Sequence, residues 1–95
     1  MDERDRVELI TRVTEMEQNF DEILAAKSRK PDSFLHDPVI KEKLMKLIDY
    51  YEHGQWLRDY ESDERGELPA GLKRGVLSQD AVYNLLEEFD RSKSI

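Results

Sequence analysis

The feature that most constrains the fold is an apolar stripe near the N-terminus. Its five residues follow one another at intervals of three or four positions, with no glycine or proline between them. They are Leu9, Val13, Met16, Phe20 and Ile23. Such intervals bring all five side chains to one face of an α-helix. The stripe therefore predicts an amphipathic helix over about residues 4–28, and the apolar face of this helix must pack against another element.

A second amphipathic helix is predicted after a proline break. Pro31 disfavours helical geometry for the residue before it and cannot donate a backbone hydrogen bond, so the first helix must end nearby. Asp37 and Pro38 then form a pair that is typical of a helix start. Apolar residues recur at helical intervals from there to Tyr51. We expect a helix over about residues 38–53, antiparallel to the first because the connection is short.

The C-terminal half predicts two shorter helices with a loop between them. Trp56 and Tyr60 have helical spacing, three glycines and a proline between residues 66 and 75 indicate a loop, and Ser78 precedes a last amphipathic stretch. The expected elements are a helix over about 55–64, a Gly/Pro loop and a helix over about 79–91. The sequence thus predicts an all-α fold, a small helical bundle in which residues 1–95 form a single domain.

Charge and cysteine content narrow the classes of partner and site. The formal net charge is −7, because 22 acidic residues outnumber 15 basic ones. An acidic surface repels the phosphates of nucleic acids and of anionic lipids, so we expect no nucleic-acid partner and no membrane. The chain has no cysteine, which excludes disulfides and thiolate metal sites. With neither a signal peptide nor a long apolar span, the expected location is the cytoplasm.

An acidic run in the C-terminal half has the composition of a cation site. Its candidate ligands for Mg²⁺ or Ca²⁺ are Asp59, Glu61, Asp63 and Glu64. An EF-hand loop starting at Asp59 would need Gly at its sixth position and Glu at its twelfth, where the chain has Glu64 and Ala70. The favoured interpretation is therefore a solvated helix end, with no metal, no cofactor and no catalytic residue. Cation binding stays open as an alternative.

Aromatic and basic side chains in the middle of the chain are typical of a binding surface. Aromatic rings and arginines are the side chains that dominate binding energy at protein interfaces. The candidates for an interaction surface are Tyr50, Trp56, Arg58, Tyr60, Lys73 and Arg74. The alternative is that the rings close the small core.

A distinctive string of residues fills the same region. From Trp56 to Ser78 it reads W-L-x-D-Y-E-x-D-E-x-G-x-L-P-x-x-L-K-R-G-V-L-S. Over about residues 44–89 the chain resembles a family of small uncharacterised bacterial proteins that share a domain of unknown function. The resemblance implies a bacterial, single-domain helical protein. It brings no assigned activity, so no catalytic residue follows from it.

The string also suggests a structural contact within the chain. Lys73 and Arg74 follow the acidic run, so the loop is expected to fold back and pair them with Asp59, Asp63 or Glu64. Such a clasp would dock the apolar residues of the loop on the first two helices. These residues are Leu68, Leu72, Val76 and Leu77.

The combined observations favour a non-enzymatic protein-interaction or small regulatory module that binds a protein partner. The stripe of the first helix also suits a homodimer. Two alternatives stay open. One is a divalent-cation-binding protein or metal-dependent enzyme that uses the Asp59–Glu67 run. The other is an acidic inhibitor or immunity-type protein that uses the whole negative surface.

Overall fold

The apolar stripe near the N-terminus forms the longest helix. The computed structural model of the chain, which describes residues 2–93, has helix α1 over Glu3–Arg29. Asp2 caps this helix, because its side chain accepts a hydrogen bond from the backbone N–H of Asp5 at 2.8 Å. Four of the five stripe residues are buried and Met16 is partly buried. The stripe is covered within the chain, so it is not free for the self-association predicted from it.

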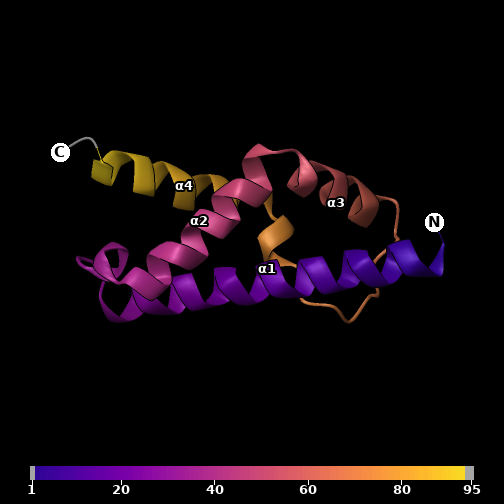
Figure 1. Cartoon of the computed structure of the whole chain (residues 1–95), viewed down its shortest axis with the longest axis horizontal. Coiled ribbons are helices and arrows are strands. Elements are labelled where there is room, and N and C mark those ends of the chain that lie inside the picture. The colour runs from indigo at the N-terminus through magenta and orange to yellow at the C-terminus, as the bar shows by residue number, and fades with distance from the viewer. Residues whose placement is uncertain (1, 94–95) are drawn as a thin grey trace.

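The described part of the chain contains four α-helices and two short 3₁₀ helices, joined by turns and loops, and no strand (Figure 1). In chain order they are α1, η1 (Phe34–His36), α2 (Pro38–Glu52), α3 (Gln55–Glu64), η2 (Gly75–Leu77) and α4 (Gln79–Lys93). The predicted all-α bundle is confirmed, and the helix ends differ from the predicted ones by at most two residues. None of the helices in this part of the chain has both the length and the apolar character needed to cross a membrane.

The first two α-helices form the predicted antiparallel hairpin (Figure 1). Asp37 caps α2 by accepting a hydrogen bond from the backbone N–H of Val39 at 2.9 Å, and Pro38 occupies the first helical position. Leu44 and Leu47 on α2 are fully buried in the core that α1 also lines. Local capping signals and apolar spacing therefore suffice to define this half of the fold.

A left-handed glycine turns the chain from α2 into α3. Gly54 has a φ of +85°, a conformation that residues with a Cβ atom rarely adopt. The turn packs α3 on α2 and brings the ring of Trp56 against those of Tyr51 and Tyr60, at centroid distances of 5.1 and 5.2 Å. The predicted third helix is thus confirmed, with its aromatic residues gathered at the junction.

Residues 65–77, which we call the strap, leave the end of α3 and cross α1 before α4 begins (Figure 1). Leu68, Val76 and Leu77 of the strap are buried in the core, and Leu72 is partly buried. A segment with the composition of a loop is therefore anchored by apolar side chains on the helical hairpin, as predicted.

Helix α4 follows the strap, packs against η2 and adds the last apolar face to the core. Its residues Val82, Leu85 and Phe89 are buried. An ion pair between Lys27 Nζ and Glu88 Oε2, 2.6 Å apart, links α4 to the C-terminal end of α1. The last helix is thus held mainly by one apolar face, which is the arrangement its amphipathic pattern predicts.

Candidate functional site

Two of the aromatic residues predicted to form an interaction surface lie inside the molecule. Tyr50 is 6% exposed and Trp56 is 5% exposed. The indole N–H of Trp56 donates a hydrogen bond to the carbonyl oxygen of Val76 in the strap at 2.8 Å. Tyr50 and Trp56 therefore do not form a surface, and the alternative that these rings close the small core is confirmed for both.

The other four candidates for that surface have separate surroundings. Arg58 is exposed at a hollow between α1 and α3. Tyr60 is partly buried, and the hydrogen bond to Glu64 raises the pKa of its hydroxyl. Both remaining residues belong to the strap: Arg74 is partly buried, whereas Lys73 is exposed at a groove on α1. Of the six predicted surface residues, only Lys73 lines the groove described below.

Asp59 is the centre of a buried polar cluster that joins three helices. It is 1% exposed, and its carboxylate accepts hydrogen bonds from Arg12 Nε and Nη2 at 2.8 Å, from the Tyr50 hydroxyl at 2.6 Å and from Gln55 Nε2 at 3.0 Å. The hydrogen bonds to Asp59 raise the pKa of Arg12, while burial raises the pKa of Tyr50. At neutral pH Arg12 is therefore charged and Tyr50 is not. The cluster links α1, α2 and α3.

The acidic run does not converge on a cation site. Asp59 points into the buried cluster, Asp63 pairs with Arg74, and Glu61 and Glu64 are exposed. Within residues 2–93, no three His, Cys, Asp or Glu side chains come together in a way that could hold a metal ion. Arginine side chains pair with two carboxylates of this run, Asp59 with Arg12 and Asp63 with Arg74.

The predicted clasp forms with one of its two cations. The Arg74 guanidinium pairs with Asp63 at the end of α3 and donates to two backbone carbonyl oxygens of the strap at 2.9 and 3.1 Å. Lys73 does not reach the acidic run. Its Nζ lies 2.7 Å from Oδ2 of Asp21 on α1. The strap is therefore attached to α3 through Arg74 and to α1 through Lys73.

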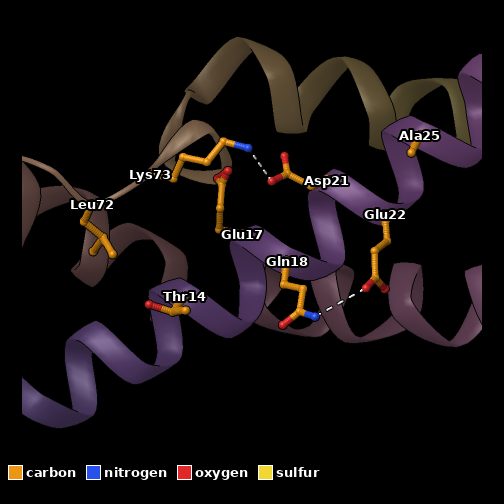
Figure 2. A pocket seen from close by; sticks show the side chains of 8 residues that line it. All are labelled: Thr14, Glu17, Gln18, Asp21, Glu22, Ala25, Leu72 and Lys73. Atoms are coloured by element: carbon orange, nitrogen blue, oxygen red, sulfur yellow. Dashed lines mark hydrogen bonds and ion pairs between the residues drawn. The ribbon is translucent and has the colours of Figure 1, made fainter.

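A groove with a volume of about 350 Å³ lies between α1 and the strap, and we call it the strap groove (Figure 2). It is lined by Thr14, Glu17, Gln18, Asp21, Glu22, Ala25, Leu72 and Lys73. The six lining residues of α1 recur at intervals that place them on one face of the helix. Leu72 and Lys73 form the opposite wall. The strap groove therefore exists only because the strap crosses the long helix.

Glu17 is a buried acid that the sequence analysis did not single out. It is 5% exposed, and its Oε1 accepts a hydrogen bond from the backbone N–H of Val76 at 2.7 Å. A Cβ atom at Gly75 would lie 3.4 Å from either Glu17 oxygen, so glycine lets the strap approach the carboxylate closely. The sequence does contain a signal for the burial of Glu17. Glu17 lies four residues after Val13 and three before Phe20, which is the face of the apolar stripe.

The rim of the strap groove carries charged side chains that form ion pairs. Asp21 pairs with Lys73, and Glu22 pairs with Lys43 on α2 at 2.7 Å and accepts a hydrogen bond from Gln18 at 3.4 Å. The hydrogen bond to Asp21 raises the pKa of Lys73, and the hydrogen bond from Lys43 lowers the pKa of Glu22. Both groups are therefore charged at neutral pH. Apolar walls beside such carboxylates suit a ligand that joins an aliphatic chain to a cation.

Comparison with known proteins gives the family of the chain. The sequence profile of a domain of unknown function, DUF4298, matches residues 13–94. This range contains every residue that lines the strap groove. No curated protein and no solved structure matches the chain. Since the profile covers most of the length, the chain belongs to the DUF4298 family.

Proposed function

We propose that this domain is a non-enzymatic protein-interaction module and that the strap groove is its binding site. The observation that carries the proposal is a groove whose exposed wall is mostly carbon, from Leu72, Ala25 and the aliphatic parts of polar side chains, on a chain in which 39% of residues are charged. Ligand-binding clefts are concave, largely apolar and mostly about 300–1,000 Å³ in volume. At about 350 Å³ the strap groove has room for one or two side chains of a partner.

The walls of the strap groove are positioned before any partner arrives. Glu17 holds the strap at Val76, and the Arg74 guanidinium holds it at Asp63. A site that is already ordered loses less conformational entropy on binding, which raises affinity for a given contact area. The internal bonds of the strap therefore support a binding role for the surface that the strap creates.

The placement of the most buried acid also supports binding over catalysis. Asp59, the least exposed carboxylate of the described chain, accepts four hydrogen bonds, three of which join α3 to α1 and α2. His53 is exposed and lies 3.0 Å from the exposed Asp49 on the outer face of α2. These groups stabilise the fold or contact solvent, and they lie outside the strap groove.

Selection from a phage-displayed library of random peptides tests the proposal. Ala25 is exposed and lines the strap groove, so Ala25→Trp fills the groove without entering the core. Thr11→Trp places the same ring at an exposed position of α1 outside the groove and serves as the control. Peptides enriched on the unmodified protein are expected to bind Thr11→Trp and to lose binding to Ala25→Trp.

Circular dichroism establishes that both tryptophan variants are folded before they are compared. The proposal fails if the library yields no enriched peptide. It also fails if the enriched peptides bind Ala25→Trp as well as they bind the unmodified protein.

A further inference from the structure

One carboxylate oxygen in the strap groove has no hydrogen-bond donor. Glu17 is 5% exposed, and its Oε1 takes the backbone N–H of Val76. Its Oε2 receives no hydrogen bond from any residue between 2 and 93. This oxygen is not among the buried atoms that lack a partner, so water still reaches it, and a ligand that covers it must supply a donor or a cation. The groove therefore presents an acceptor that the described chain leaves open.

Lys73 is the cation of the strap groove. Its ammonium interacts electrostatically with Glu17 and bonds to Asp21, 2.7 Å away. Figure 2 shows the side chain reaching from the strap towards both carboxylates. The Lys73 side chain is 77% exposed. Exposed lysine–carboxylate pairs stabilise a fold very little, because the ammonium keeps most of its water and the long side chain loses freedom. A second cation can therefore displace it.

We propose that the strap groove takes a segment of a partner protein in which a lysine or arginine stands beside an aliphatic residue. The inference rests on the proposed function and names the chemistry of the partner. The partner's cation displaces Lys73 from Asp21 and donates to the open oxygen of Glu17. The neighbouring aliphatic side chain lies against Leu72, at one end of the groove (Figure 2). Lys73 is thus an internal competitor that lowers the affinity for the partner.

Charge complementarity favours this occupant. Three carboxylates line the strap groove, and two lysines pair with two of them, Lys73 with Asp21 and Lys43 with Glu22. The carboxylate of Glu17 is the negative charge in excess. The net charge of −7 adds to the field that attracts a basic segment. An acidic or phosphorylated segment is repelled by the same field. A purely apolar segment would cover Glu17 without giving it a donor.

Three small probes separate the contributions of charge and aliphatic chain. Hexylammonium carries both the cation and the chain, 1-hexanol carries the chain alone, and hexanoate carries the chain with the opposite charge. Each is titrated into isotope-labelled protein while amide chemical shifts are recorded. The variants are Lys73→Ala, which removes the competitor, and Asp21→Asn, which removes its carboxylate. Lys46→Ala removes an exposed lysine outside the groove and serves as the charge-matched control.

Hexylammonium is expected to bind in the strap groove more tightly than 1-hexanol, and hexanoate to bind most weakly. Lys73→Ala should raise the affinity for hexylammonium by about two- to fivefold, since it removes an exposed ion pair that competes for the site. Lys46→Ala should leave this affinity unchanged, and Asp21→Asn should lower it. The affinity for 1-hexanol should be the same in all variants.

Two results overturn the inference, and they differ in what they say of the proposed function. If hexylammonium and 1-hexanol bind the groove equally and Lys73→Ala has no selective effect, the groove binds partners but does not select a cation. If no probe shifts the amides of the groove residues, the inference fails together with the groove as a binding site.

Discussion

Asp59 accepts four hydrogen bonds, and its donors stay satisfied only while the carboxylate is present. Asp59→Ala would leave the buried Tyr50 hydroxyl without an acceptor and Arg12 without a counter-ion. We expect the free energy of unfolding in urea to fall by about 3 kcal/mol. Asp49→Ala, which removes an exposed carboxylate paired with His53, should change it by less than about 0.5 kcal/mol. Equal losses in the two variants would contradict a structural role for the cluster.

Tyr50 makes the stability of the fold sensitive to alkaline pH. Burial raises its pKa, so the folded protein holds the hydroxyl proton more tightly than the unfolded chain does. The contribution of Tyr50 is therefore complete below the ordinary tyrosine pKa of about 10 and is lost as the pH rises further. Lys73, whose pKa is also raised, adds a change of the same sign. We expect the free energy of unfolding to decline above about pH 10.

Tyr50→Phe removes the tyrosine part of this pH dependence. Urea midpoints measured on both sides of about pH 10 should decline less steeply in Tyr50→Phe than in the unmodified protein. Tyr83 is 56% exposed, so Tyr83→Phe is the control and should keep the full slope. A slope that is the same in both variants would show that Tyr50 does not couple to folding.

At the scale of the elements, the two cations of the strap make unequal contributions. Arg74 bonds to Asp63 and to two backbone carbonyls, whereas Lys73 makes one exposed pair with Asp21. Arg74→Ala should lower the free energy of unfolding by about 1–2 kcal/mol, and Lys73→Ala by less than about 0.5 kcal/mol. Thermal unfolding followed by the fluorescence of Trp56, which bonds to the strap, measures both effects. A larger loss in the free energy of unfolding for Lys73→Ala than for Arg74→Ala would contradict the conclusion that Arg74 is the main anchor of the strap.

The elements were predictable from the sequence where their signals are local. The intervals of the apolar stripe define α1, and the Asp37-Pro38 pair marks the start of α2. The contacts between elements were not predictable, because Arg12 and Asp59 are 47 positions apart and Glu17 and Val76 are 59 positions apart. In the sequence, Asp59 is one member of a run of acidic residues. In the folded structure, its carboxylate accepts two hydrogen bonds from Arg12 on another helix.

The candidate site was also predictable only in part, because its residues come from segments far apart in the sequence. The sequence predicts that Lys73 lies on the surface, but its partner Asp21 belongs to a helix face that shows no special pattern in the sequence. An indole ring suits both a core and an interface, so the sequence leaves Trp56 open between the two. The strap that bonds to it follows twenty residues later in the chain. Glu17 had a local signal, a charge on the apolar face of α1, which only the folded strap explains.

At the scale of the whole molecule, the domain is an elongated body of 46 × 22 × 19 Å. Helix α1, with 27 residues, is about 40 Å long and so runs along most of it. One face of α1 packs on α2 and the core, and an adjacent face forms the strap groove with Leu72 and Lys73. The groove is therefore a product of the overall architecture, and a partner that fills it would contact segments far apart in the sequence.

A chemical-shift map of a bound peptide decides whether the strap groove is the binding site. Isotope-labelled protein is titrated with a peptide enriched in the selection, and the change in each amide signal is recorded. We predict that the largest changes fall on the α1 face between Thr14 and Ala25 and on Leu72 and Lys73. They should vanish in Ala25→Trp and persist in Thr11→Trp. Changes centred on α4, or on the hollow between α1 and α3, would contradict the assignment of the binding site.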